Sequence, residues 1–416
     1  MTKQAVLLQQ VHRELTSVHR GNARSREPST GVPKKLDPKR RIRRKTKASD
    51  RSFQYYGYTL ASSEGVIIGL KTVTEVYEID PLQDERWVVF LAKHRSAAVF
   101  HSPEWLRALQ RTYRYRIGAL TTAGPGESLT NALVFCRVRS WLTGRRLVSV
   151  PFADHCSPLF EAENELDSLL SRLKQECERG DDRYLEIRST TNGAAGMTSS
   201  ASFCLHKIDL HPNLDILFHA LHGNCIRRKI ARAQREGVTY EEGTSPEILG
   251  KFYQLTVLTR RRHRVPPQPL AWFRNLIDCM GEKLKIRLAS YQGRPVAGIL
   301  TLRHKATMTY KYGCSDSQFH RFGPMQLVLW KAIQEAKNDG LLEFDLGRTE
   351  EANEGLLTFK DRWGATRSTL TYSRYPAPTT RRASETASMR LVKSLCVLTP
   401  DSLLTRAGNL LYPHID

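Results

Sequence analysis

The amino-acid sequence predicts a mixed α/β protein built from two tandem units of the same kind. The order strand, turn, strand, loop, helix, glycine, strand occurs twice, at residues 132–190 and again at 285–349. The length of 416 residues exceeds that of one ordinary domain, and 40% apolar and 25% charged residues are usual for a folded protein. Each strand, helix, strand crossover implies a parallel strand pair with a right-handed connection.

The first unit is expected to contain three strands and two helices. Ser102 and Pro103 favour the start of a helix, because serine caps helix N-termini and proline suits the first turn. Leucines at helical spacing, followed by Gly180, predict the second helix. The expected elements are a helix at 101–113, strands at 132–138 and 146–152, a helix at 163–178 and a strand at 184–190.

The second unit repeats this order. Apolar residues from Met325 to Ala336 fall on one helical face, and Gly340 ends that helix. Tyr310 and Tyr312 alternate with a lysine, so both tyrosines are expected on one face of their strand. The expected elements are strands at 285–291, 296–304 and 307–313, a helix at 325–336 and a strand at 341–349.

Two basic helices are expected between these blocks, at 213–236 and 246–262. The first carries Arg227 and Arg228, and the second ends with Arg262. Guanidinium groups suit phosphate recognition, so these three arginines are candidates for binding an anionic substrate. A solvated basic face is the alternative interpretation.

The net charge of +22 indicates attraction to polyanions such as RNA, phosphorylated substrates, nucleotide sugars or anionic lipid surfaces. Part of this charge is local, because ten Lys or Arg face two Asp between residues 34 and 51. The apolar content there is too low for folding. Residues 1–80 are therefore expected to form a basic, mostly disordered leader that acts as a solubilising tail or as a tether to nucleic acid or membrane.

Four segments are expected along the chain. The leader (1–80) is followed by a first domain at 85–204, a second domain at 205–376 and an amphipathic tail at 377–416. The tail either docks on the protein itself or touches a membrane surface. No stretch approaches the roughly 18 apolar residues of a membrane span, and the N-terminus lacks a signal-peptide pattern. We therefore expect a cytoplasmic protein, with peripheral contact at the inner face of the membrane as a further option.

No residue spacing indicates a metal site. The eight cysteines are scattered singly, without Cys-x-x-Cys pairs or paired Cys/His spacing. Asp154, His155 and Cys156 are adjacent in the sequence, but neighbouring side chains cannot face one another as a catalytic triad does. The sequence therefore predicts no metal dependence, and it disfavours Cys156 as a nucleophile.

Blocks between residues 85 and 376 resemble a known family. PVAGILTLRH, TYKYGCSD, MQLVLWKAIQEAKNDG and FDLGRTEEANEGLLTFKDRWG are similar, in this order, to the C-terminal acyltransferase domain of FemAB-like proteins of the GNAT superfamily. The upstream blocks VFHSPEW, SVPFADHCSPL, IRRKIARAQREGV and TRRRHRVPPQP resemble members associated with exopolysaccharide or surface-polymer loci. The resemblance implies two tandem GNAT-like domains that share a cleft and transfer an acyl or aminoacyl group to an amine.

Three residues are candidates for this chemistry, which needs an aligned neutral amine and a donor to the developing oxyanion. Lys360 matches the Phe-Lys motif of the family, in which the lysine lies at the donor site. Asp154 follows a strand that resembles the family's first-domain motif and is a candidate for binding or orienting the amine. Tyr312 is a candidate acid that donates to the leaving group, with core packing as the alternative.

Five residues are candidates for holding the donor. Asp345, Gly347 and Arg348 lie at the end of a central strand, where open α/β sheets bind ligands; the alternative is a buried Asp/Arg pair that holds the loop. Arg321 and Gly323 occupy the loop where coenzyme-A-using relatives bind pyrophosphate at a helix N-terminus. The usual Arg-x-x-Gly-x-Gly/Ala pattern is incomplete there, and the following proline removes one N–H donor.

The resemblance implies an N-acyltransferase that uses acyl-coenzyme A or aminoacyl-tRNA as a co-substrate and holds no tightly bound cofactor. An acyl-carrier donor is a further option. The expected acceptor is an amine on an anionic cell-envelope or surface-polysaccharide precursor. Two other functions stay open from the sequence: a non-catalytic polyanion-binding scaffold with the same fold, and an acetyltransferase that acts on a small amine or sugar. The residues do not identify the oligomeric state.

Overall fold

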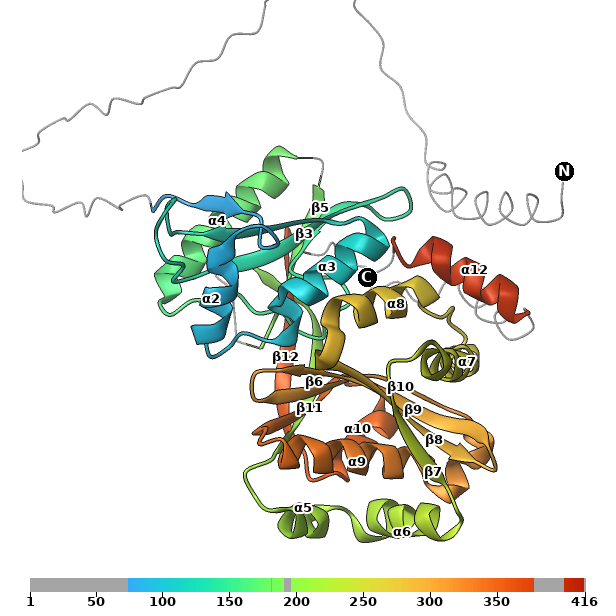
Figure 1. Cartoon of the computed structure of the whole chain (residues 1–416). Coiled ribbons are helices and arrows are strands. Elements are labelled where there is room, and N and C mark those ends of the chain that lie inside the picture. The colour runs from blue at the N-terminus through green and yellow to red at the C-terminus, as the bar shows by residue number, and fades with distance from the viewer. Residues whose placement is uncertain (1–73, 181, 191–195, 378–399, 415–416) are drawn as a thin grey trace, which may run out of the picture. The chain divides into compact units, whose positions relative to one another are not determined.

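The computed structural model describes residues 74–180, 182–190, 196–377 and 400–414. The described residues belong to one compact unit (Figure 1). Nearly all of the expected leader and part of the expected tail lie outside the described residues. None of the helices in the described ranges is both long and apolar enough to cross a bilayer.

Twelve strands of the described residues form one continuous sheet, in the order β1-β2-β3-β4-β5-β12-β6-β11-β10-β9-β8-β7. We call β1 to β5 the first arm and β7 to β11 the second arm, and β12 and β6 join them. The strands are β1 (Tyr77–Ile79), β2 (Arg116–Thr121), β3 (Leu133–Ser140), β4 (Gly144–Val148), β5 (Asp182–Ser189), β6 (Thr198–Asp209), β7 (Thr239–Gly243), β8 (Leu284–Tyr291), β9 (Arg294–His304), β10 (Thr307–Ser315), β11 (Glu343–Glu350) and β12 (Thr366–Tyr375).

Two of the longer helices begin directly after a serine that caps them. Ser102 and Ser245 each accept a hydrogen bond from a backbone N–H three residues later, and each precedes a proline in the first turn. The predicted start of the helix after Ser102 is thereby confirmed. The helices are α2 (Glu85–Lys93), α3 (Pro103–Tyr113), α4 (Glu163–Arg179), α5 (Leu214–Ala220), α6 (Arg228–Arg235), α7 (Pro246–Arg262), α8 (Leu270–Met280), α9 (Pro324–Asn338), α10 (Glu354–Asp361) and α12 (Asp401–Leu411).

The two arms repeat one topology, which confirms the prediction of a duplicated mixed α/β unit. In the first arm, α4 connects β4 to β5, and these two strands are parallel. In the second arm, α9 connects β10 to β11, and this pair is parallel as well. The other neighbours within each arm are antiparallel. Parallel strands end at the same edge of a sheet, so each crossover can bring side chains together there.

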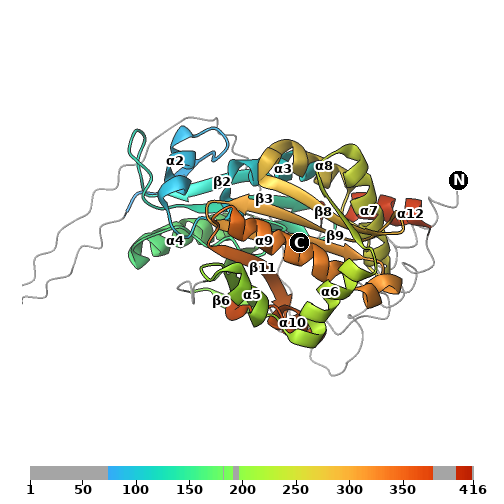
Figure 2. The same ribbon diagram turned by 60° about the horizontal axis from the view of Figure 1, so that its bottom comes forward.

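The two arms share one apolar core. Helix α3 packs against α8 between the arms (Figure 1). Trp105 of α3 and Trp272 of α8 are both fully buried and meet edge to face, with ring centroids 5.2 Å apart. Helix α4 covers the outer face of the first arm, and α5, α6 and α9 cover the outer face of the second arm (Figure 2). The shared core therefore fixes the residues that lie where the arms meet.

The helical segment expected at 213–236 is divided. Helix α5 ends at Ala220, a π-helical turn follows at Gly223–Arg227, and α6 comes next. His222 lies at the break, where its backbone N–H donates to Arg362 O at the end of α10. The helical ladder is interrupted because this N–H is used for a contact with another helix.

The strand expected over 146–152 ends earlier, at Val148. Ser149 N still donates to Glu186 O, and after it the chain leaves the sheet as a loop. The boundary expected between residues 204 and 205 falls inside β6, whose neighbours are β12 and β11. A division of the chain at that residue remains a prediction.

The last described helix, α12, lies against the elements that lead into α8. Leu404 is buried, and Tyr412 Oη donates to Pro266 O at 3.2 Å. An ideal Cβ on Gly408 would lie 2.1 Å from Pro267 O, so the helix can approach this closely because residue 408 has no side chain.

Replacing Gly408 with Ala is expected to lower the free energy of unfolding by about 1–3 kcal/mol, because α12 must shift to admit the methyl group. Gly250→Ala in α7 is the matched control, since nothing lies within 4 Å of its ideal Cβ. That change should be neutral or stabilise the protein by up to about 1 kcal/mol. Chemical denaturation measures both variants. Equal stability of the two would show that Gly408 is not a close packing contact.

Candidate active site

The candidate active site lies where β10 and β11 part. These strands pair in parallel over three residues each, near their starts. The register of β10 then shifts between Tyr310 and Tyr312, and the register of β11 shifts between Asp345 and Arg348. A bulge bends its strand and re-aims side chains, and here two bulges lie next to one another. The sheet therefore opens at this level.

The bulge in β10 places Tyr310 and Tyr312 on opposite faces, so the expectation that they share a face is wrong. Tyr310 packs on the core beneath α9, whereas Tyr312 packs on the core shared by α3 and α8. Lys311 is the extra residue, with no partner on β9, and one extra residue inverts the alternation of every side chain beyond it.

Tyr312, a candidate acid from the sequence, lies in the aromatic part of this junction. Its Oη accepts a hydrogen bond from Trp272 Nε1 at 2.8 Å, and its ring meets Phe273 edge to face. Burial raises the pKa of Tyr312, so the hydroxyl keeps its proton at neutral pH.

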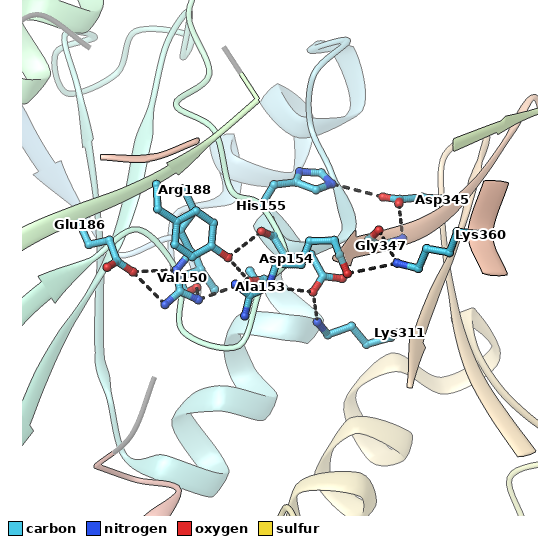
Figure 3. Close-up of polar contacts among 12 residues, drawn as sticks. Val150, Ala153, Asp154, His155, Glu186, Arg188, Lys311, Asp345, Gly347 and Lys360 are labelled. Carbon is cyan, nitrogen blue, oxygen red and sulfur yellow. Dashed lines mark hydrogen bonds and ion pairs between the residues drawn. The ribbon is translucent and has the colours of Figure 1, made fainter. Parts of the chain in front are cut away.

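Asp154 is presented by the loop that follows β4, and two side chains hold the backbone of that loop (Figure 3). Arg188 of β5 donates to Val150 O and Ala153 O, both at 3.3 Å. Tyr372 of β12 donates to Asp154 O at 2.8 Å. The carboxylate therefore extends from a fixed backbone.

The same loop contains a strained residue. Phe152 has φ of 60°, in a region that bulky residues rarely adopt. Its ring packs on Tyr113 and Trp272, with centroid distances of 4.8 Å and 6.2 Å. Such strain persists where the surrounding packing fixes the conformation, and it is concentrated at functional sites. The aromatic contacts thus set the path of the chain into Asp154.

Asp154 forms an ion pair that joins the two arms. Its Oδ1 accepts a hydrogen bond from Lys311 Nζ at 2.9 Å, and the Lys311 side chain is 5% exposed. The rings of Phe100, Trp105 and Tyr312 lie 5.1, 5.7 and 5.5 Å from the ammonium. The carboxylate and the ring faces together offset the cost of removing this charge from water.

Arg348 is the more accessible cation of the group. Its Nε lies 3.8 Å from Asp154 Oδ1, and its side chain is 32% exposed. The guanidinium stacks over the rings of Phe203 and Tyr372, at 4.5 and 5.1 Å. A planar guanidinium held in this way is suited to binding a carbonyl or phosphate oxygen.

Gly347 allows β11 to approach Asp154. Its φ of 70° lies in the left-handed region that favours glycine. An ideal Cβ at this position would lie 2.9 Å from Asp154 Oδ2. Because residue 347 has no side chain, the backbone of β11 can approach the carboxylate of Asp154.

Lys360 reaches the same place from α10 (Figure 3). Its Nζ donates to Gly347 O at 2.7 Å and to Arg348 O at 3.1 Å, and the residue is 2% exposed. Burial lowers the pKa of Lys360 to about 8, against the opposing effect of the Asp154 and Asp345 carboxylates. An ammonium has three N–H donors, so it can serve one acceptor beyond these two carbonyls.

Asp345 supports the bulge in β11. Its Oδ1 accepts a hydrogen bond from Gly347 N at 2.7 Å, and its Oδ2 lies 3.3 Å from His155 Nε2. Burial opposes ionisation, but the contact with His155 and the Gly347 N–H hold the pKa of Asp345 below its ordinary value. This buried carboxylate therefore links the bulge to the residue that follows Asp154.

Arg321 and Gly323 belong to a second cluster, at the N-terminus of α9. Gly323 has φ of 77°, and an ideal Cβ there would lie 2.4 Å from Lys229 O, so α6 touches this loop. Arg262 Nη1 donates to Ser315 O, at the end of β10, at 3.0 Å. Arg262 was expected to bind the acceptor. Its guanidinium instead contacts the end of β10, the strand that leads into the loop expected to bind the donor.

Arg227 and Arg228 lie at the junction of the π-helical turn and α6. Arg228 is exposed, and Arg227 is half-buried. Their part in substrate binding remains a prediction.

Sequence reasoning did not identify Lys311 and His155 as site residues. The sequence signal that could have identified Lys311 is a lysine between two tyrosines inside a predicted strand. A lysine that is buried in a strand needs a partner for its charge. Cys156 is buried, and burial raises its pKa well above the ordinary value, which agrees with the expectation that it is not a nucleophile. No cluster of three or more His, Cys, Asp or Glu side chains suited to a metal ion occurs within the described ranges.

A double-mutant cycle with Asp154→Asn and Lys311→Met is expected to give a coupling energy of about 1–3 kcal/mol in the free energy of unfolding, because the two charges are largely removed from water. The matched control is Arg303 with Asp339, a pair at 2.9 Å whose side chains are 45% and 39% exposed. That pair should couple by less than about 1 kcal/mol. Similar coupling for the two pairs would contradict a buried junction.

Part of the chain matches a known family of domains. Residues 223–361, which include α9, α10 and Lys360, match the family described as acetyltransferase (GNAT) domain. No curated protein sequence matches the chain.

Two solved structures share the fold. The crystal structure of FemX is similar with a TM-score of 0.56 and 14% sequence identity, over 71% of this chain and 96% of that chain. A conserved protein of unknown function from Bacteroides thetaiotaomicron VPI-5482 is similar with a TM-score of 0.50 and 11% identity, over 72% of this chain and 98% of that chain. The two likenesses show that the chain shares its fold with FemX, and the family match shows that residues 223–361 are similar to a GNAT acetyltransferase domain.

Proposed function

We propose that this enzyme transfers an acyl, acetyl or aminoacyl group from an activated donor to an amine on a cell-envelope or surface-polysaccharide precursor. The observation that carries the proposal is the convergence of Asp154 from the first arm with Lys360 and Arg348 from the second arm. Acyl transfer to an amine needs a group that orients the nucleophile and a cation that meets the developing oxyanion. This junction holds groups of both kinds.

Lys360 supplies the positive charge. Its two hydrogen bonds to carbonyls of β11 fix the ammonium, and its remaining N–H is available to the oxyanion that forms when the amine attacks the acyl carbon. A charge in a site this dry acts more strongly than the same charge in water.

Asp154 orients the acceptor amine. The amine takes a place beside Lys311 as a second partner of the carboxylate, and Asp154 accepts the proton that nitrogen loses as the C–N bond forms. As the bond between the acyl carbon and the donor breaks, Tyr312 donates its proton to the leaving sulfur or oxygen. The raised pKa of Tyr312 supports this role, since the hydroxyl is protonated at the start of the reaction.

The donor is an acyl-coenzyme A or an aminoacyl-tRNA, with an acyl-carrier protein as the further option. The cluster of Arg321, Gly323, Lys229 and Arg262 supports phosphate binding, because it lies at the start of α9 and several of its members carry positive charge. Arg227 and Arg228 are assigned to an anionic acceptor. The reaction is assigned to the cytoplasm, at the inner face of the membrane.

The donor class is tested by a thermal-shift series with acetyl-coenzyme A, longer acyl-coenzyme A species and aminoacyl-tRNA, followed by release of free thiol or tRNA in the presence of amino sugars. Stabilisation by one class, with amine-dependent release, would support the proposal. A protein that binds no member of the series and no acyl-carrier donor would contradict it.

Lys360→Met is expected to lower kcat by about 100-fold or more while the donor KM changes little, because the charge acts on the transition state. The native ammonium loses its proton as the pH rises through about 8. After correction for ionisation of the acceptor, the wild-type rate should therefore fall above that pH. Lys360→Arg keeps the charge, so its rate should show no such fall.

A second readout of Lys360 does not depend on turnover. The pKa of Lys360 is about 8 in the folded protein, below the ordinary lysine value of 10.5, so the unfolded chain binds more protons between these two pH values. The stability of wild type relative to Lys360→Met should rise with pH over this interval. A difference in stability that does not change with pH would contradict the buried ammonium.

Arg262→Gln and Arg321→Gln are expected to raise the KM for the donor about fivefold or more, with kcat little changed, because each removes a charge-assisted contact to phosphate. Arg235→Gln is the matched control, since Arg235 lies on α6 with a side chain that is 73% exposed. Steady-state kinetics at fixed salt measure all three. Equal effects of the three changes would indicate attraction by overall charge and no defined donor site.

A further inference from the structure

Large exposed apolar side chains gather around α12. Eight such residues are well exposed in the described part of the chain, and four of them lie on α12 or on elements that contact it: Trp141 (61% exposed), Leu258 (40%), Leu403 (40%) and Leu410 (45%). Leu403 and Leu410 are seven residues apart, so they share one face of the helix. We call Trp141, Leu403 and Leu410 the C-terminal apolar face.

Trp141 lies in the turn between β3 and β4, next to the residues that follow α12. Its ring centroid lies 5.2 Å from that of His414, just after α12. Arg139 and Arg145 oppose one another across the same hairpin. Arg145 also forms an ion pair with Asp182 at 3.7 Å, so the exposed Arg139 is the positive charge that this hairpin can offer to an anionic surface.

The inner side of α12 fixes the orientation of the face. Leu404 and Tyr412 are buried, and Gly408 packs directly on the chain that precedes α8. Asp401, at the start of the helix, forms an ion pair with Arg261. Leu403 and Leu410 are therefore held outward, because the helix cannot roll them into the core.

A recess of about 490 Å³ lies on another side of α12, between α12, α7, α8 and the end of α3. Its walls include Tyr113, Tyr253 and Leu270, while Arg274 and Thr405 supply polar groups. Arg274 is exposed. A space with aromatic and aliphatic walls and a cation suits an amphiphile with an apolar body and an anionic head.

Charge identifies the kind of surface that would cover the face. Arg406 lies on α12 between Leu403 and Leu410 and is exposed, and the whole chain has a net charge of +22. Exposed leucines interspersed with arginine on an amphipathic helix are typical of contact with anionic bilayers, and tryptophan prefers the level of the lipid headgroups.

We propose that the C-terminal apolar face rests on an anionic lipid bilayer. Trp141, Leu403 and Leu410 enter the headgroup region, and Arg406 and Arg274 lie beside lipid phosphates. The contact is independent of the acyl-transfer chemistry, and it would hold the enzyme at a membrane surface.

The fluorescence of Trp141 can report contact between this face and lipid. The other five tryptophans of the chain, at positions 87, 105, 272, 330 and 363, are buried. Brominated lipids quench tryptophan at short range, so vesicles of brominated phosphatidylglycerol and phosphatidylcholine should quench part of the full-length protein's emission. Trp141→Phe should show no such quenching while it still sediments with the vesicles.

Vesicle sedimentation at low salt and at about 0.5 M salt distinguishes binding by the C-terminal apolar face from binding by charge attraction alone. Salt screens the charge attraction. The triple variant Trp141→Ser, Leu403→Ser, Leu410→Ser should bind about tenfold more weakly at high salt, because it loses the apolar contact. Val88→Ser with Val89→Ser is the matched control, since both valines are exposed on α2. This control should change binding less than twofold.

Three outcomes would overturn the proposal. The first is wild-type sedimentation without quenching by brominated lipid, which would assign membrane binding to another part of the chain. The second is equal binding by the triple variant and the control. The third is no vesicle binding at all; a concentration-dependent dimer lost in the triple variant would then assign the face to a second copy of the chain.

Discussion

The ion pair between Asp154 and Lys311 is the contact on which the rest of the site depends. It joins a loop of the first arm to a bulge of the second, across 157 positions of sequence, and a buried pair is tolerable when further groups satisfy both charges. Arg188 and Tyr372 hold the loop backbone, three aromatic rings surround the ammonium, and Gly347 leaves room for the carboxylate. Each of these features positions, surrounds or makes room for one of the two charged groups of the pair.

The two arms differ at the ends of their equivalent strands, β5 and β11. This difference explains why the end of β5 is filled and the end of β11 is open. In the first arm, the buried Glu186 of β5 pairs with the buried Arg188 and with the partly exposed Arg374, so these three side chains fill the strand end. In the second arm, Asp345 bonds the backbone of its own bulge and leaves Arg348 to face Asp154. The end of β5 is therefore filled by side chains of its own arm and of β12, whereas the end of β11 faces the carboxylate of Asp154.

Local patterns in the sequence were enough to predict both crossover units, their helices and most of their strands. Lys360, Asp154, Gly347 and Arg348 were also identified, and the structure brings these four together. Periodicity could not show Lys311 as their partner, because a single extra residue in β10 inverts the side-chain alternation without any change in composition. The break at His222 was missed for a similar reason, since it depends on a contact with Arg362 that is remote in sequence.

The position of β12 has a consequence for how the chain is made. This strand is the last of the sheet to be synthesised, yet it lies between β5 and β6 near the middle. Until residue 375 has left the ribosome, β5 keeps an unpaired edge, and unpaired edges recruit other strands. The sheet of the first arm therefore stays incompletely paired until almost all of the second arm has been synthesised. Loss of β12 would divide the sheet into two pieces with exposed edges, so the integrity of the sheet depends on the strand that is added to it last among the described residues.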